Sequence, residues 1–162
     1  MSQIFLDCDG VLADFDRAAE QLFQQNSRQA EAALGTKIFW SRISGCGSFY
    51  GDLPLLPDAM RLYQSIAHLH PIILTGCPAG GWAEPQKVEW AARHFPGVEI
   101  ITCRSRDKSR FLRSPGDILV DDYLKYQNLW EEAGGIFVHH QTADLSIQHL
   151  ARLGLPVRQY AI

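Results

Sequence analysis

The sequence predicts an α/β fold, a doubly wound, Rossmann-like parallel sheet of five strands with a small helical cap inserted after the first strand. Three observations predict this fold class. Short apolar segments recur along the chain, helical patterns lie between most of them, and a long interval separates the first two. With 162 residues, 46% of them hydrophobic and 20% charged, the chain has the size and composition of one globular domain.

The apolar segments have the length of strands rather than of helices. They occupy residues 4–6, 71–74, 98–102, 118–120 and 136–138. Helices are predicted over residues 84–94, 123–133 and 143–153, and Gly134-Gly135 marks the end of the second of these. Strands that alternate with helices form parallel sheets covered on both faces, so a doubly wound sheet follows.

The interval after the first strand is longer than one crossover helix needs. We expect a helix over residues 14–34, then the aromatic and glycine-rich stretch KIFWSRISGCGSFYGDLPLLP, then a helix over residues 58–68. An insertion at the carboxyl end of a strand is well placed to cover an active site. The predicted division is therefore a core of residues 1–14 and 71–162 with a cap of residues 15–70.

Bulk properties favour a cytoplasmic protein without membrane or extended nucleic-acid binding. Met1-Ser2-Gln3 does not resemble the start of a signal peptide, and no apolar run approaches membrane-spanning length. The four cysteines contain no CxxC pair, which argues against a zinc site or a disulfide framework. The net charge is −3, and the basic residues cluster only in one short segment suited to attracting a small anion: Arg104, Arg106, Lys108, Arg110 and Arg113.

Acidic residues follow two of the predicted strands. In the stretch IFLDCDGVLADF, Asp7 and Asp9 end the first strand, and Asp121 and Asp122 end the fourth. Open α/β sheets bind ligands beyond the carboxyl ends of their strands, so these four carboxylates and the Thr75 hydroxyl should converge. Like charges at close range require a proton or a cation. An all-oxygen ligand set of this kind suits Mg²⁺ completed by a substrate phosphate.

Each of these segments also has a simpler interpretation. Asp-x-Asp-Gly begins calcium-binding loops, but an EF-hand requires an oxygen ligand at Val11 and Glu near Ala18. Asp121-Asp122 alone is compatible with a strand end followed by a helix N-cap. Thr75-Gly76 alone is an ordinary exit from a strand. The three segments together, in this order and at strand ends, favour a reactive site.

Three segments resemble motifs I, II and IV of the haloacid dehalogenase (HAD) superfamily of phosphohydrolases: DCDGVLADF, ILTG and ILVDD. They occur in the family's order and span most of the chain. Within the superfamily the chain is most similar to the 5′(3′)-deoxyribonucleotidase group. The similarity lies in the DGVLADF start and in four later segments: LPLLPDA at 53–59, QKVEW at 86–90, RDK at 106–108 and FVHH at 137–140.

The resemblance implies a phosphomonoesterase that works through an aspartyl-phosphate intermediate. Asp7 would be the nucleophile, and Asp9 would give a proton to the leaving alkoxide and take one from water. Mg²⁺ would be held by the Asp7 carboxylate, the Asp9 backbone carbonyl and Asp121, with Asp122 supporting the metal shell.

The resemblance also implies a phosphate-binding set. Thr75 and backbone N–H groups near Gly10 and Gly76 would bind phosphate oxygens. Lys87, at the start of a predicted helix, matches the motif III position and would stabilise the phosphoryl charge. Lys108 is the alternative, because some branches of the superfamily place this lysine closer to motif IV. The competing interpretation for either is a solvated surface lysine.

Aromatic residues of the cap are candidates for holding a nucleobase, since stacking contributes about 1 to 3 kcal/mol per base. The candidates are Phe15, Phe39, Trp40, Phe49 and Tyr50, with Trp82 from the core. For any one of them, packing inside the cap is the competing interpretation. The expected substrate is a small phosphate ester, a (deoxy)nucleoside monophosphate.

Two other functional classes remain open. One is the same chemistry on another small phosphate ester or on a phosphate-bearing nucleic-acid end. The other is a non-enzymatic phosphate-binding domain similar to a response-regulator receiver. Receivers carry their acidic pair on the first strand and a lone phosphoacceptor Asp later, whereas here Asp-x-Asp comes first and the pair comes fourth, which disfavours that class.

Overall fold

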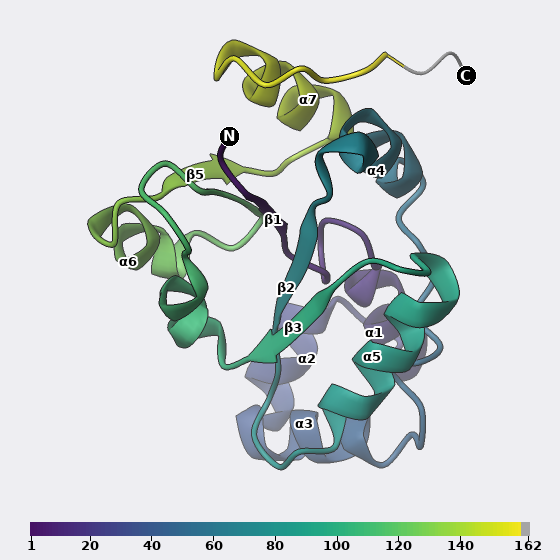
Figure 1. Cartoon of the computed structure of the whole chain (residues 1–162). Helices are drawn as coiled ribbons and strands as arrows, with labels where there is room; N and C mark the ends of the chain where they lie inside the picture. The colour runs from purple at the N-terminus through teal and green to yellow at the C-terminus, as the bar shows by residue number, and fades with distance from the viewer. Residues whose placement is uncertain (160–162) are drawn as a thin grey trace.

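A five-stranded parallel sheet forms the centre of the molecule (Figure 1). The computed structural model describes residues 1–159. The strands lie in the spatial order β3-β2-β1-β4-β5, and every neighbouring pair is parallel. Their bounds are β1 (Ile4–Leu6), β2 (Ile72–Gly76), β3 (Ile100–Cys103), β4 (Ile118–Asp121) and β5 (Ile136–His139). The predicted doubly wound α/β architecture is confirmed.

Each face of the sheet contributes to its own apolar core, because successive side chains of a strand point to opposite faces. Leu6 and Val120 face the larger core, which includes residues of the helices after β1 and of α5 (Ala83–His94). Phe5 faces the smaller core and packs edge-on against Trp130, with ring centroids 5.5 Å apart. Strands buried on both faces explain why their segments read as continuous apolar runs.

The cap begins with two helices where one was predicted over residues 14–34. Helix α1 (Phe15–Phe23) ends at Gln24, which has the left-handed φ of 57°. Helix α2 (Ser27–Leu34) begins after Asn26, whose side chain accepts hydrogen bonds from the first N–H groups of α2. The single long helix is therefore wrong, because Asn26 stabilises a second helix start within the predicted span.

A third cap helix, α3 (Thr36–Ser44), occupies much of the stretch expected to be an aromatic, glycine-rich connection. Gly35, with a φ of 85°, separates it from α2. Phe39 and Ile43 are four residues apart and both buried, so α3 packs through the face that this spacing produces.

The last helix of the predicted cap contacts a helix of the predicted core. Helix α4 (Ala59–Ile66), continued by the 3₁₀ helix η1 (Ala67–Leu69), packs against α7 (Ala143–Arg152), and the two lie together in Figure 1. Arg61 and Asp144 join them through an ion pair of 2.7 Å. The predicted cap and the predicted core therefore contact each other through α4 and α7.

Two short helices near the site differ from the prediction. Helix α6 (Gln127–Glu132) is shorter than the predicted span 123–133, because the 3₁₀ helix η3 (Leu124–Tyr126) precedes it. A further 3₁₀ helix, η2 (Ser105–Phe111), follows β3 where no helix was predicted. Within residues 1–159, no helix is both long and apolar enough to cross a membrane.

Candidate active site

The carboxyl ends of β1 and β4 are neighbours at the point where the strand order reverses, which is where open α/β sheets bind ligands. Asp7 follows β1 directly, and Asp121 is the last residue of β4. The Asp7 N–H donates to the Val120 carbonyl at 2.9 Å, which fixes the two acidic residues relative to each other. The pairing of β1 with β4 therefore brings Asp7 and Asp121 close together, as predicted.

A tight turn follows Asp7. The Val11, Leu12 and Ala13 N–H groups all donate to the Cys8 carbonyl, at 3.2, 2.8 and 2.9 Å. Gly10 has a φ of 84°, and a Cβ atom there would overlap the Asp122 carboxylate. Glycine is therefore required at position 10 both for the turn and for the approach of Asp122.

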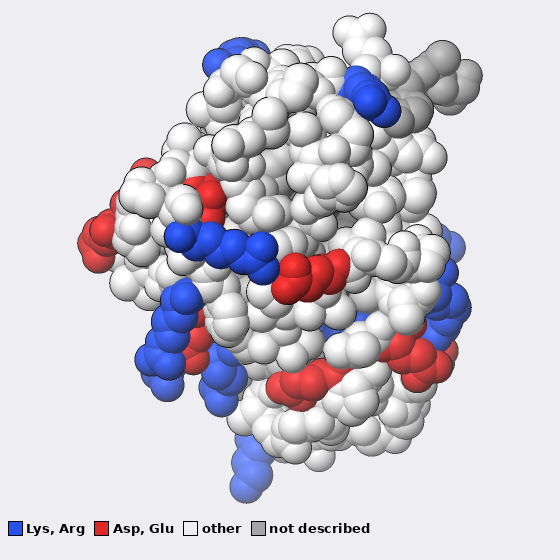
Figure 2. All heavy atoms as spheres, viewed as in Figure 1, with Lys and Arg blue, Asp and Glu red and all other residues white. Residues whose placement is uncertain are grey.

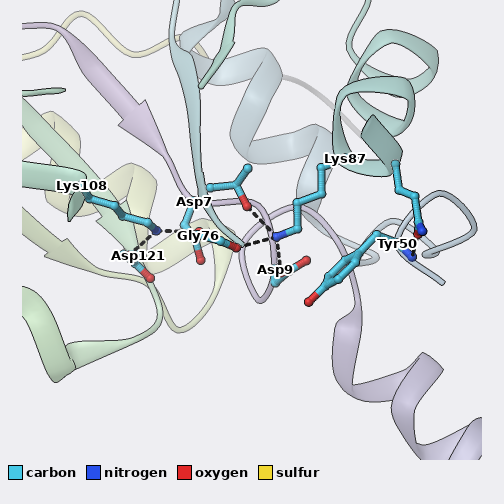
Figure 3. Close-up of polar contacts among 9 residues, drawn as sticks. Asp7, Asp9, Tyr50, Gly76, Lys87, Lys108 and Asp121 are labelled. Atoms are coloured by element: carbon cyan, nitrogen blue, oxygen red, sulfur yellow. Dashed lines mark hydrogen bonds and ion pairs between the residues drawn. The ribbon is translucent and has the colours of Figure 1, made fainter. Parts of the chain in front are cut away.

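Lys108 joins the two strand ends (Figure 3). Its Nζ donates to Asp7 Oδ1 at 2.7 Å and to Asp121 Oδ2 at 2.9 Å. Lys108 comes from η2, the helix that was not predicted, and it is buried. The Asp121 Oδ1 atom accepts from the Tyr123 N–H at 3.0 Å, which orients the carboxylate toward the lysine.

Lys87 holds the second aspartate of the turn. Its Nζ lies 2.8 Å from each of three oxygen atoms, Asp9 Oδ2, Thr75 Oγ1 and the Gly76 carbonyl. Lys87 comes from α5 and is only 1% exposed, so it is not a surface lysine. In Figure 3 Lys87 and Lys108 approach the end of β1 from opposite sides. The structure thus brings both candidate lysines to the site, each on a different aspartate.

Burial dominates the electrostatics of the carboxyl groups. It raises the pKa of Asp9, against the opposing effect of Lys87, and Asp9 Oδ1 is buried with no hydrogen-bond partner among the described residues. Burial and then the charge of Asp7 raise the pKa of Asp121 to about 7. Desolvation by surrounding atoms and then the charges of Asp7 and Asp121 raise the pKa of Asp122 to about 8, although this residue is exposed at the surface. The cluster therefore holds more negative charge than its surroundings stabilise.

The neighbouring carboxylates also affect the pKa values of the two lysines. Burial is the largest single effect on Lys87 and lowers its pKa, but the charges of Asp9, Cys8 and Cys77 and the hydrogen bond to Asp9 together outweigh burial and raise the pKa. Asp7 and Asp121 do the same for Lys108. Both lysines are thus held as cations within the site.

The carboxylates fit a divalent cation. Asp7, Asp121 and Asp122 each offer an oxygen atom, and these three atoms lie within 4.8 Å of one another. Oxygen-only donors suit Mg²⁺, and the overlap at Gly10 shows that the Asp122 carboxylate is directed toward the β1 turn. The Asp9 side chain is engaged by Lys87 instead.

A cavity of about 730 Å³ opens over these residues, a volume typical of small-molecule sites. Asp7, Asp9, Lys108, Asp121 and Asp122 line its floor. Its walls carry four of the candidate aromatic residues: Phe15, Trp40, Tyr50 and Trp82. The Tyr50 ring lies 4.5 Å from Lys87 Nζ, so the cap reaches the reactive end of the cavity.

Phe39 and Phe49 do not line the cavity. Phe39 is 2% exposed and stacks on Phe23, with ring centroids 4.8 Å apart. Phe49 is buried edge-on against Phe15. These two rings belong to the packing of the cap in this structure, as the competing interpretation allowed.

Several cavity residues were not among the predicted site residues, and three of them are consecutive. Arg104, Ser105 and Arg106 line it from the segment that enters η2. A Cβ atom on Gly76 would overlap the Ser105 side chain, so this segment contacts the end of β2 directly. The clustering of basic residues after the third strand was the available signal, but the sequence does not reveal that η2 turns them toward the site.

No known family model matches this chain, and no curated protein matches it. Several solved structures match it in fold. A HAD-superfamily hydrolase from Ehrlichia chaffeensis matches with a TM-score of 0.55 over 96% of this chain and 100% of that chain, at 11% identity. A hydrolase from Streptococcus pneumoniae TIGR4 matches with a TM-score of 0.54 over 94% and 98%, at 12% identity. This chain has the HAD fold.

A protein described as a dehalogenase also matches, with a TM-score of 0.54 over 94% of this chain and 96% of that chain, at 10% identity. At these identities the likeness is one of fold. The predicted HAD architecture is confirmed, and the resemblance to the deoxyribonucleotidase group stays a prediction.

Proposed function

We propose that this protein is a Mg²⁺-dependent phosphomonoesterase that transfers a phosphoryl group first to Asp7 and then to water. The observation that carries the proposal is the pair of aspartates on the β1 turn, each held by its own buried lysine. Lys108 holds Asp7 beside Asp121, and Lys87 holds Asp9 beside Thr75. Two carboxyl groups in different surroundings suit two chemical roles.

In the first step a carboxylate oxygen of Asp7 attacks phosphorus, and the ester P–O bond breaks. The departing alkoxide takes a proton from Asp9 and leaves as an alcohol, while the phosphoryl group remains on Asp7. In the second step water attacks phosphorus and gives a proton to Asp9. The bond to Asp7 breaks, and inorganic phosphate leaves.

The two lysines have different roles in this reaction. Lys108, 2.7 Å from Asp7, is placed to stabilise negative charge on the transferred group. Lys87 positions Asp9, and it also donates to the hydroxyl of Thr75, which is fully buried and does not line the cavity. This assigns the charge-stabilising role to Lys108, the alternative in the sequence-based prediction, and a positioning role to Lys87.

Asp7, Asp121 and Asp122 would hold the Mg²⁺ ion. When bound, it would offset the repulsion between the anionic nucleophile and the phosphate. The three carboxylate oxygens within 4.8 Å of one another support this assignment.

Asp9 favours a phosphate ester over a halide as substrate. A halide leaves without a proton, whereas an alkoxide needs one. Asp9 has a raised pKa and a buried oxygen without a partner among residues 1–159, so this oxygen is available to take up a proton and pass it on.

We propose a (deoxy)nucleoside monophosphate as the substrate. The aromatic side chains that line the cavity, four of the predicted candidates among them, support this, because a base can stack on an aromatic ring. The test is a screen of the purified protein with nucleoside 5′- and 3′-monophosphates, sugar phosphates and a haloacid, with Mg²⁺ and with EDTA. We expect Mg²⁺-dependent phosphate release, fastest from nucleotides. Halide release without phosphate release would overturn the proposed reaction, and a preference for sugar phosphates would overturn the proposed substrate.

A further inference from the structure

The segment around η2 carries four arginines that differ in their partners. Two of them lie away from the cavity and each pairs with a carboxylate. Arg110 Nε lies 3.6 Å from Asp107 Oδ1, and Arg113 lies 3.3 Å from Glu99. The guanidinium groups of these two arginines are therefore each paired with a carboxylate at the surface.

Arg104 and Arg106 are different. Both line the cavity, both are exposed, and neither pairs with a carboxylate among residues 1–159. Basic side chains gather on the side of the molecule where Figure 1 draws η2 (Figure 2). Because the whole chain has a net charge of −3, this group is a local feature.

Two contacts fix this segment beside the reactive end of the cavity. Ser105, between the two arginines, lies against Gly76 at the end of β2. The Cys77 N–H donates to the Cys103 carbonyl at 2.7 Å, which holds the start of the segment against the same strand end. Lys108, two residues beyond Arg106, contacts Asp7. The arginines therefore border the phosphoryl-transfer centre without belonging to it.

We infer that Arg104 and Arg106 form a subsite for a second phosphate group, so that the preferred substrate is a small organic bisphosphate. The inference rests on the proposed function and adds a second phosphate group to the proposed substrate, so that a nucleoside bisphosphate should bind more tightly than the nucleoside monophosphate. Lys108 lies beside Asp7 and is placed to bind the phosphate that is transferred, which leaves the two guanidinium groups for another anion. Guanidinium groups bind phosphate through two parallel N–H donors and remain charged at all physiological pH values. The cavity of about 730 Å³ has room for a substrate that reaches from Asp7 to the arginines.

The test measures binding, so that it does not depend on turnover. The Asp7→Asn protein with Mg²⁺ is titrated by calorimetry with two pairs of ligands, a nucleoside 3′,5′-bisphosphate with its 5′-monophosphate, and fructose 1,6-bisphosphate with fructose 6-phosphate. The same titrations are made after adding Arg104→Gln, Arg106→Gln, both, or Arg110→Gln. Arg110→Gln is the matched control, because this arginine lies on η2 but not on the cavity. Thermal melts check that each variant is folded.

We expect tighter binding of the bisphosphate in at least one pair, and a loss of about tenfold in that preference for each cavity arginine replaced. Monophosphate binding should change little, and Arg110→Gln should leave the preference intact. A preference in the nucleotide pair supports a nucleoside as the rest of the substrate, whereas a preference in the sugar pair alone would overturn the nucleoside part of the proposed function. An equal loss for both members of a pair, or no preference in either pair, would overturn the inference. A preserved preference without phosphate release from any ester by the wild type would instead overturn the proposed function.

Discussion

Asp7 and Asp9 are two residues apart, yet the structure gives them different partners. Lys108 and the carboxylates of β4 surround Asp7, whereas Lys87 and Thr75 surround Asp9. Asp9 also keeps one buried oxygen without a partner within residues 1–159. Such surroundings suit Asp7 for attack on phosphorus and Asp9 for proton transfer.

Replacing Asp9 with Asn should therefore impair hydrolysis according to the leaving group. An alkyl phosphate needs the proton, so we expect its rate to fall about 10² to 10⁴-fold. p-Nitrophenyl phosphate releases a stable anion and should lose much less. Steady-state rates on both substrates measure the difference. The matched control is Asp52→Asn, an exposed aspartate, which should slow neither substrate. Equal losses on the two esters would exclude Asp9 as the leaving-group acid.

At the level of elements, the cap is fastened to the core through α5. Gln86 accepts from the Tyr50 N–H at 2.9 Å and donates to the Gly47 carbonyl at 2.9 Å. Trp90, one turn later, donates to the Leu53 carbonyl at 2.8 Å. The same helix thus carries Lys87 and positions the loop that places Tyr50 over it.

Replacing Gln86 with Ala should loosen this loop. We expect faster amide hydrogen exchange in residues 47–50, a higher KM, and a free energy of unfolding lower by about 1 to 2 kcal/mol. Hydrogen exchange measured by mass spectrometry provides the direct readout. Glu89→Gln, an exposed change on the same helix, should alter none of these. Unchanged exchange in residues 47–50 would contradict the role of Gln86 as the fastening residue.

The elements also show which parts of the site the sequence could predict. Asp7, Thr75 and Asp121 were predictable because apolar strands end at them, and parallel strands bring their carboxyl ends together. Helix η2 was not predictable, since a 3₁₀ helix lacks the apolar period of an α-helix. The position of Lys108 on Asp7 therefore had to come from the structure.

The cap shows a second limit of prediction. Its aromatic residues were visible as a group, but which of them face the cavity depends on how α1 and α3 are rotated against each other. Phe39 is turned into the cap and Trp40, the next residue, lines the cavity. The break between α1 and α2 was also hidden, because Gln24 adopts a left-handed conformation that sequence patterns assign to Gly or Asn.

Over the whole molecule, two buried aspartates lie at opposite ends of β4, Asp117 before its amino end and Asp121 at its carboxyl end. Asp117, just before β4, is 1% exposed. It accepts from the backbone N–H groups of Gln3, Arg113 and Ser114 at 3.0, 2.8 and 2.9 Å. It thus ties the amino terminus and the segment after η2 to the amino end of β4, whereas Asp121 serves the site at the carboxyl end.

Asp117→Ala should therefore destabilise the fold without changing the chemistry. Three partly buried N–H groups would lose a charged, buried acceptor, so we expect the free energy of unfolding to fall by about 3 kcal/mol. Urea unfolding measures the loss, and kcat per folded molecule should stay the same. Asp144→Ala is the control, because its exposed ion pair with Arg61 should contribute no more than about 1 kcal/mol. Equal losses for the two variants would contradict this role of Asp117.

The assignment of Asp7 as the nucleophile of a Mg²⁺-dependent phosphatase underlies the whole proposed reaction. Its most direct test is the rate of phosphate release by Asp7→Asn beside the wild type, on the best substrate of the screen and at saturating Mg²⁺. We expect the substitution to lower kcat by at least about a thousandfold while the protein remains folded. A folded Asp7→Asn protein that releases phosphate at the wild-type rate would contradict the claim.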